Sequence, residues 1–296
     1  MKGLIVKALS GFYYVKVDNN IFECRARGKF RNVGESPLVG DYVEVSVADS
    51  SGTVDYIYDR KNFLQRPPIA NIDKLFIISS AVTPSPNLTL IDKMTALCES
   101  KNIEPIIIFN KSDLQSLAGY VEKYKNVGYK AIECSAANNT GIEEIIEELK
   151  GSISAFTGNS GVGKSSILNI IFPNLNLSTG NVSSKLGRGK HTTRHTELFA
   201  HGFNGYVADT PGFSSIEYTP EDINFKDNLD SYFPEFSDIK SNCKFSDCKH
   251  IGEKGCAVCA AAKDGIIDAD RLSSYQSIYN ELKDFKPWDV KKTEGK

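Results

Sequence analysis

The chain has 296 residues, of which 41% are hydrophobic and 24% charged, so it can bury a sizeable core in about two domains. No apolar run approaches the ~20 residues that cross a bilayer, and residues 1–7 have the pattern of a strand rather than of a signal segment. The net charge of −2 gives no general attraction for a polyanion, so nucleic acid would need a local basic patch. We therefore expect a cytoplasmic protein without membrane contacts, whose seven cysteines are thiols or metal ligands rather than disulfides.

Residues 1–66 predict an all-β first domain. Apolar and polar residues alternate at 12–17 and 41–47, and turn-forming residues separate these segments, a pattern typical of a small barrel or sandwich. The run Arg66, Pro67 and Pro68 then marks a linker, because consecutive prolines exclude both a helix and a central strand.

A basic stretch in this first domain is a candidate surface for nucleic acid. Arg25, Arg27, Lys29 and Arg31 alternate with non-basic residues, so an extended backbone would place all four on one face. Phe22 and Phe30 could stack on bases beside them. A solvated strand edge protected by its charges explains the stretch equally well.

Residues 67–216 predict an α/β domain. Continuous apolar runs occur at 75–78, 105–109, 153–156 and 206–208, as in parallel strands that helices cover on both faces. Leu90, Met94 and Leu97 share one face of an intervening helix. Thr140 and Glu143 have the spacing of a capping box that would open a helix over 142–149.

Residues 217–296 predict a small third domain, mostly helical and rich in polar residues. It contains four of the seven cysteines. Its last helical segment places four apolar side chains on one face, namely Leu272, Tyr275, Tyr279 and Leu282.

A phosphate-binding loop is predicted after the apolar run at 153–156. The pattern G-x-x-x-x-G-K-S is formed by Gly158, Asn159, Ser160, Gly161, Val162, Gly163, Lys164 and Ser165. It opens a helical stretch at Ser166, which is the context that a P-loop requires. Backbone N–H groups would contact phosphate oxygens, Lys164 would reach the β- and γ-phosphates, and Ser165 would ligate Mg²⁺. The alternative is a glycine-rich turn before a helix.

A guanine-binding motif is predicted at the end of another strand, where Asn110, Lys111, Ser112 and Asp113 follow the run at 105–109. A carboxylate only accepts hydrogen bonds, so Asp113 can pair with the N1–H and N2–H groups of guanine, whereas adenine has no matching donors. Ser135 and Ala136, after a further strand, would supply a backbone N–H to the base. A turn that merely closes a strand is the alternative interpretation.

Two further segments fit a γ-phosphate sensor. Asp209 and Gly212 have D-x-x-G spacing: Asp209 would hold Mg²⁺ through water, and the Gly212 N–H would contact the γ-phosphate, although a plain Pro-Gly turn also fits. The basic, glycine-rich segment 185–194 carries Thr192 and Thr193. Either threonine could ligate Mg²⁺ once nucleotide orders the loop, and the spacing does not choose between them.

The base motif precedes the P-loop, whereas Ras-type GTPases have the opposite order. We therefore predict a circularly permuted GTPase that binds GTP or GDP with Mg²⁺. Ras-type enzymes use a glutamine after D-x-x-G to orient the attacking water, but Phe213 occupies that position here. His191 is the local candidate for this role, and it could instead only contact solvent or RNA.

A metal site is predicted from the pattern C-x₄-C-x-H-x₅-C, formed by Cys243, Cys248, His250 and Cys256. Three thiolates and one imidazole suit tetrahedral Zn²⁺, and four protein ligands leave no position for a catalytic water, so we expect one structural zinc. Cys259 could replace a ligand, with His250 the least secure of the four. Chance clustering of free thiols is the alternative.

Taken in chain order, these motifs resemble the RsgA (YjeQ/YloQ) family of small-subunit-dependent GTPases. The resemblance implies an OB-fold over residues 1–66, a permuted GTPase domain over 67–216 and a zinc-binding domain over 217–296. It also implies a late role in maturation of the small ribosomal subunit, with that subunit stimulating GTP hydrolysis. The family's catalytic histidine matches His191.

We expect the partners to be the small ribosomal subunit and its rRNA, and the protein to be a monomer. Two other interpretations remain open from the sequence. One is a GTP-sensing RNA-binding module in which hydrolysis is incidental. The other is a zinc protein that binds nucleic acid and keeps a vestigial nucleotide fold, which a measured preference for GTP over ATP would exclude.

Overall fold

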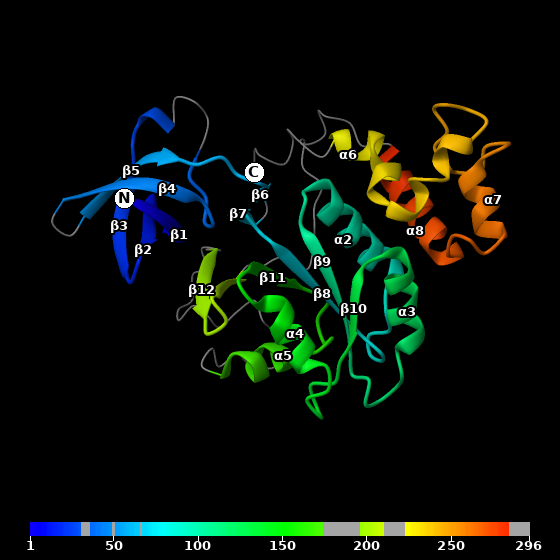
Figure 1. Ribbon diagram of the computed structural model, residues 1–296, viewed down its shortest axis with the longest axis horizontal. Helices are drawn as coiled ribbons and strands as arrows, with labels where there is room; N and C mark the ends of the chain where they lie inside the picture. Colours follow the sequence, from blue (N-terminus) through cyan, green and yellow to red (C-terminus); the bar gives the residue numbers. More distant parts are fainter. Residues whose placement is uncertain (31–35, 49–50, 66, 174–195, 210–222, 284–296) are drawn as a thin grey trace, which may run out of the picture.

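The computed structural model describes residues 1–30, 36–48, 51–65, 67–173, 196–209 and 223–283. Figure 1 shows a β-barrel, an α/β region and a helical lobe following one another along the molecule. The predicted succession of fold types is therefore confirmed. Among the described residues, no helix combines the length and the apolar character needed to cross a bilayer.

Within the described part of the N-terminal domain, five strands form a barrel. They are β1 (Lys2–Leu9), β2 (Phe12–Val17), β3 (Asn20–Ala26), β4 (Tyr42–Ala48) and β5 (Ser51–Ile57). Their order is β1-β2-β3-β5-β4, and β4 returns to β1, which closes the barrel. This is the five-stranded closure of an OB-fold. Alternate valines such as Val15, Val43 and Val54 fill its interior.

The predicted basic face on the barrel is wrong in part. Strand β3 ends at Ala26, and Lys29 has a helical backbone, so the period-two argument stops after Arg27. Arg25 and Arg27 are exposed. Phe30 is buried in the barrel core rather than free to stack on bases, and Arg31 lies outside the described residues.

The linker between barrel and α/β region is a packed hairpin. It consists of β6 (Phe63–Gln65) and β7 (Pro68–Ala70). Pro68 begins its strand, a position that a residue without an N–H tolerates. Ile69 and Ala70 are fully buried, so this boundary is part of the core.

The α/β region contains six strands and four helices among the described residues. They are β8 (Lys74–Ser80), α2 (Leu88–Ser100), β9 (Glu104–Asn110), α3 (Ala118–Val127), β10 (Lys130–Glu133), α4 (Ile142–Leu149), β11 (Ile153–Thr157), α5 (Lys164–Ile171), β12 (Glu197–His201) and β13 (Gly205–Asp209). The strand order is β10-β9-β8-β11-β13-β12, and only the β12–β13 pairing is antiparallel.

Helices cover both faces of this sheet. One buried cluster joins alternate residues of β8 and β9 to α2 and α3, and a second joins the remaining residues to α4 and α5. The continuous apolar runs in the sequence are explained by this double coverage. The predicted capping box is wrong, because Thr140 pairs through its backbone with Ser135 and α4 begins after Gly141 without a side-chain cap.

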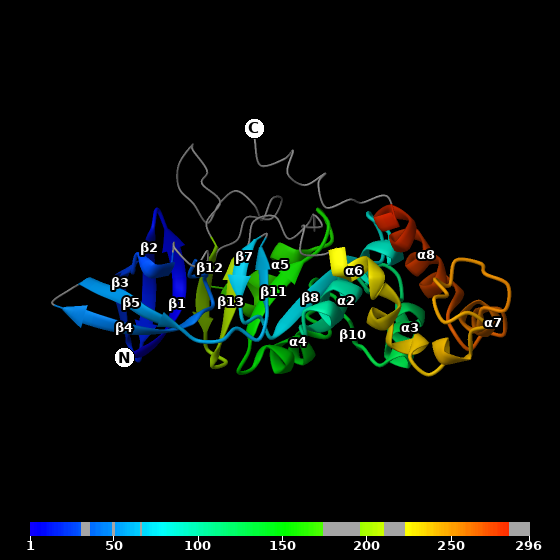
Figure 2. The same ribbon diagram turned by 90° about the horizontal axis from the view of Figure 1, so that it is seen from above.

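The C-terminal lobe is built from short helices around one long one. Its elements are α6 (Ile223–Asp227), η3 (Leu229–Tyr232), η4 (Pro234–Phe236), η5 (Lys240–Asn242), α7 (Ala257–Lys263) and α8 (Ala269–Lys283). Leu272, Tyr275 and Leu282 are buried as the pattern predicts, and Tyr279 packs at the edge of the same cluster. In Figure 2 the lobe adjoins the α/β region, where α8 contacts α2.

Candidate nucleotide-binding site

The P-loop connects β11 to α5 at the carboxyl edge of the parallel sheet. Its local shape demands glycine at two positions. Gly163 precedes α5 with a φ of 91°, and a Cβ there would collide with the side-chain amide of Asn110. A Cβ on Gly158 would collide with the Ile78 carbonyl. The backbone can therefore curl tightly between the two strands, as a phosphate cradle must.

Lys164 holds the predicted loop together from inside. Its Nζ donates to the Gly158 carbonyl at 2.9 Å, and burial lowers the pKa of this ammonium group. A cation that has lost much of its hydration favours an arriving anion. Ser165, on the first turn of α5, is buried beside it, and Ser166 is half-buried.

Asn110 brings three sequence motifs together. Its side chain is 1% exposed; Nδ2 donates to the Val162 carbonyl of the P-loop at 2.9 Å, and Oδ1 accepts from the Ala136 N–H at 3.1 Å. One buried amide thus joins the end of β9 to the P-loop and to the loop after β10. Because a buried amide needs its partners, this junction fixes the three loops relative to one another.

The remaining members of the base motif lie beside Asn110. Ser135 is buried, and its hydroxyl contacts Asp113 Oδ1 at 2.5 Å. Asp113 itself is exposed and Ser112 half-buried, so an oriented carboxylate faces solvent where a base could pair with it. Lys111 extends across to the loop after β8, where Nζ donates to the Thr83 carbonyl at 2.9 Å.

The loop after β8 is a part of this site that the sequence interpretation missed. Besides Thr83, the Val82 carbonyl accepts from Lys111 at 3.3 Å. Ser80 on the same strand donates to the Pro84 carbonyl at 2.7 Å. The signal available in the sequence was only a proline-rich turn after an apolar strand, Pro84-Ser85-Pro86, which is common in loops.

Several predicted site residues lie wholly or partly outside the described part of the chain. His191, Thr192, Thr193 and Gly212 lie outside the described residues. Asp209 ends β13, where its backbone pairs with Glu197, and its side chain is not described. The roles assigned to these five residues stay predictions.

The predicted metal ligands converge in the C-terminal lobe. One donor atom from each of Cys243, Cys248, His250 and Cys256 lies within 4.8 Å of the others. The His250 Nδ1 is 3.6 Å from the Cys243 sulfur and 3.4 Å from the Cys256 sulfur. A tetrahedron with ~2.3 Å Zn–S bonds would have edges of about 3.8 Å, so the donor set fits a zinc ion.

Cys259 lies just outside this group. Its Sγ donates to the His250 carbonyl at 3.5 Å, and its N–H donates to the Cys256 sulfur. The Ala257 N–H donates to the Cys243 sulfur at 3.3 Å. Such N–H donors support thiolates and orient them. Because the converging group contains the His250 nitrogen and not the Cys259 sulfur, the geometry favours His250 as the fourth donor.

The strand order and the motif order together define the class of protein. A P-loop on β11 and a guanine motif on β9 share one sheet edge, although the guanine motif comes first in the chain. The molecule is a circularly permuted P-loop GTPase.

Comparison with known proteins gives the family. The sequence model of the RsgA GTPase matches residues 57–219, and that of the RsgA N-terminal domain matches residues 2–54. The chain therefore belongs to the RsgA GTPase family. It is 46% identical to the small ribosomal subunit biogenesis GTPase RsgA of Geobacillus sp. (strain WCH70) over 293 residues, 97% of this chain and 99% of that one. It is also 46% identical to the protein of the same name from Bacillus cereus (strain ATCC 10987 / NRS 248), with the same coverage.

Solved structures with a similar fold support the same family. The crystal structure of YloQ, a circularly permuted GTPase, is similar with a TM-score of 0.79 and 38% identity over 97% of this chain and 96% of that one. YjeQ from Thermotoga maritima is similar with a TM-score of 0.81 and 35% identity over 96% of this chain and 99% of that one.

Proposed function

We propose that this GTPase binds the small ribosomal subunit late in its maturation and hydrolyses GTP to GDP and phosphate under stimulation by that subunit. The observation that carries the proposal is the Asn110 bridge between the P-loop and the Ala136 N–H. It assembles the parts of a guanine-nucleotide site despite their shuffled order. The small ribosomal subunit is proposed as the partner because the names of the relatives include it.

Each part of the site has a proposed role. The base is held by Asn110, Lys111, Ser112, Asp113, Ser135 and Ala136. The phosphates would be held by residues 158–166, and the Gly212 N–H would contact the γ-phosphate. Thr192 or Thr193 would ligate Mg²⁺, and Asp209 would hold it through water. Mg²⁺, ligated by Ser165, would supply neutralisation of the phosphate charge.

Hydrolysis needs a group that orients water. Phe213 has no polar atom to offer in the position of the Ras-type glutamine, so we assign this role to His191, whose imidazole can accept a proton from water. We expect rRNA to order the basic segment that carries it. Ordering of a transition-state group accelerates GTPases by ~10³ to 10⁵-fold.

The Cys₃His cluster is proposed to hold one structural Zn²⁺. Its donor spacing fits the ion, and four protein ligands would leave no open position for a catalytic water. Arg25 and Arg27 on the barrel are proposed to contact rRNA phosphates. The protein would act as a monomer in the cytoplasm.

The decisive experiment is multiple-turnover GTP hydrolysis with and without purified small subunits. We expect strong stimulation of the wild-type protein and loss of that stimulation in His191→Ala. An unstimulated wild type would instead favour a GTP sensor in which hydrolysis is incidental.

Base recognition is tested separately by equilibrium binding of GTP and ATP. Asp113→Asn should lose the preference for guanine, because an amide cannot accept from both N1–H and N2–H. Asp238→Asn, which removes an exposed carboxylate in the C-terminal lobe, is the matched control and should keep the preference. An unchanged preference in Asp113→Asn would contradict the assignment of the base site.

A further inference from the structure

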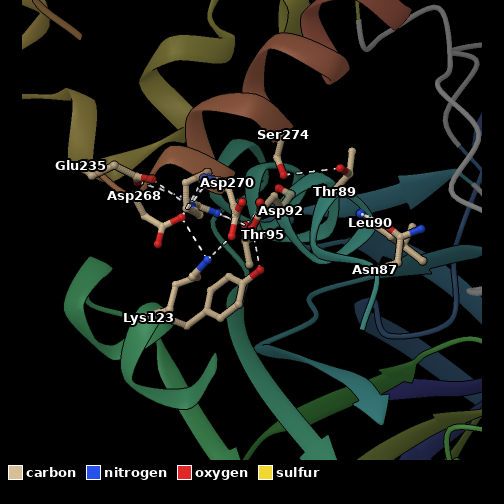
Figure 3. A network of polar contacts seen from close by, with 12 residues as sticks. Asn87, Thr89, Leu90, Asp92, Thr95, Lys123, Glu235, Asp268, Asp270 and Ser274 are labelled. Carbon is tan, nitrogen blue, oxygen red and sulfur yellow. Dashed lines mark hydrogen bonds and ion pairs between the residues drawn. The ribbon is translucent and has the colours of Figure 1, made fainter. Parts of the chain in front are cut away.

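A buried arginine joins the C-terminal lobe to the α/β region. Arg271, on α8, is 1% exposed. Its Nη1 donates to Asp92 Oδ1 of α2 at 2.7 Å, while Nε and Nη2 donate to the two Glu235 oxygens of η4 at 2.7 and 3.0 Å. Figure 3 shows Asp92 and Glu235 on opposite sides of this contact. None of these residues belongs to the P-loop, the guanine-binding motif or the D-x-x-G motif.

The surroundings of Arg271 make the contact specific. Tyr124 of α3 donates to the same Asp92 oxygen at 2.7 Å, and the guanidinium lies 4.6 Å from the Phe233 ring centroid. Burial alone would lower the pKa of Arg271, but Asp92 and Glu235 outweigh it and raise that pKa. Arg271 is therefore a permanent cation, and a planar fork that bonds two carboxylates cannot be replaced by lysine.

Surface ion pairs surround this buried contact. Lys123 of α3 pairs with Asp268 at 3.1 Å and with Asp270 at 2.5 Å, both at the start of α8. Lys93 of α2 pairs with Glu281 near the other end of α8 at 2.7 Å. The helix is thus held on α2 and α3 along its length, with the arginine as its buried attachment.

The N-terminal end of α2 connects the Arg271 contact to the nucleotide site. Thr89 and Ser274 hydroxyls are 3.5 Å apart, and Asn87 caps α2 by accepting from the Leu90 N–H at 3.0 Å. Two residues separate this cap from the 82–84 segment, whose carbonyls accept from Lys111 and Ser80. The position of α2 therefore sets the position of the segment on which the guanine-motif lysine rests.

An open groove of about 500 Å³ marks the same neighbourhood. It is lined by Pro84 and Asn87 before α2, by Asn159 of the P-loop, and by Asp270 and Ser274 of α8. The start of α8, which carries Arg271, thus lines the same groove as Asn159 of the P-loop. A shift of α8 on α2 would change the shape of this groove.

We propose that Arg271 is a positioning residue for the guanine-nucleotide site, acting through α2 and the 82–87 loop on Lys111 and the P-loop. This inference rests on the proposed nucleotide site and adds a determinant outside its motifs. Coupling between distant groups in proteins is commonly worth 5- to 150-fold in affinity. We expect about a tenfold loss of GDP affinity when the arginine contact is removed.

The test compares variants of the full-length protein by titration with a fluorescent GDP analogue, well below their unfolding temperatures. Arg271→Met keeps the length and apolar packing of the side chain but not its donors. Arg271→Lys keeps the charge. Both should bind the analogue about tenfold more weakly, because neither can bond Asp92 and Glu235 together. Lys93→Met, which removes an exposed ion pair across the same α2–α8 interface, is the matched control and should bind as the wild type does.

Zinc content separates positioning from unfolding of the lobe. The lobe has its own buried cluster around Phe233, Phe236 and Tyr275, so the Arg271 variants should keep their metal while losing affinity. If Arg271→Met fails to fold, Asp92→Leu is the second variant, because it is close in size and has no acceptor for the Arg271 Nη1 donor. Folded Arg271 variants or a folded Asp92→Leu with wild-type affinity would overturn the inference, as would affinity and zinc lost in parallel. A wild type without GDP affinity would instead refute the proposed function.

Discussion

The α/β region is joined to its two neighbours by contacts that differ in chemistry and in sequence range. Toward the barrel, two buried amides, Asn62 and Asn71, 7% and 5% exposed, form a neutral junction beside the ion pair of Arg60 with the buried Asp41. Toward the C-terminal lobe the junction is a fully buried ion pair, with Arg271 and Asp92 each 1% exposed at the side chain. Asparagine can be satisfied by any nearby backbone, whereas a buried charge requires its particular partner.

The neutral junction is local in sequence. Asn62 brackets Ile72, donating to its carbonyl at 2.8 Å and accepting from its N–H at 2.9 Å. Asn71 donates to the Gly40 carbonyl of the barrel at 2.9 Å. These bonds fold the linker on itself and against the barrel, so the junction forms with its own hairpin.

The ionic junction is long-range. Arg271 and Asp92 are separated by 179 positions, and the contact exists only once the lobe has docked. The barrel is therefore attached by contacts of the linker that follows it, whereas docking of the lobe depends on the long-range pair of Arg271 with Asp92. Three substitutions test this difference.

The largest effect is expected from Arg271→Ala. It leaves Asp92 and Glu235 without their cation in a buried site, which costs about 3–5 kcal/mol when a buried pair is broken. Denaturant unfolding of the full-length protein measures the loss. A decrease of less than about 1 kcal/mol in the free energy of unfolding would mean that the ionic junction contributes no more to stability than a surface ion pair.

A smaller effect is expected from Asn62→Ala at the neutral junction. The Ile72 N–H and carbonyl would lose their partners while buried, and an unsatisfied buried group costs about 1–3 kcal/mol. The same unfolding measurement applies. The exposed Asn20, changed to alanine, is the control and should shift stability by no more than about 0.5 kcal/mol. An equal loss of stability in the Asn62 and Asn20 variants would mean that the buried contacts of Asn62 do not stabilise the junction.

The smallest effect is expected from Lys7→Ala on the outer side of the barrel junction. Lys7 pairs with Glu197 at 2.8 Å, and both side chains are about one-third exposed, at 34% and 32%. Solvent screening limits such pairs to about 1 kcal/mol or less, and salt weakens them further. Unfolding at low and high salt should show a difference from wild type only at low salt.

Prediction from sequence succeeded where local geometry imposes the residue type. The P-loop and guanine motif directly follow apolar strands, and strand ends at one sheet edge must meet, so their convergence around Asn110 was foreseeable. The helical face of Leu272, Tyr275 and Leu282 followed from its period. These features depend on a few neighbouring residues each.

Prediction failed where distant contacts override local patterns. Arg271 lies within a helix whose apolar face was recognised, yet buried arginines are rare and nothing near it identifies Asp92 as its partner. Thr140 has the spacing of a helix cap, but its backbone pairs with Ser135 instead. The basic alternation continued past Ala26, where the strand that would give it a common face has already ended.

The bridge between β1 and β12 has a consequence for solubility. In the α/β region β12 lies at one edge of the sheet, and β1 of the barrel continues the sheet through the pair Lys7–Glu197 at the first residue of β12. An uncovered strand presents unpaired N–H and carbonyl groups to any other chain. Removing the barrel would therefore expose the edge of β12. A truncated protein that starts at the linker should self-associate where the whole chain does not.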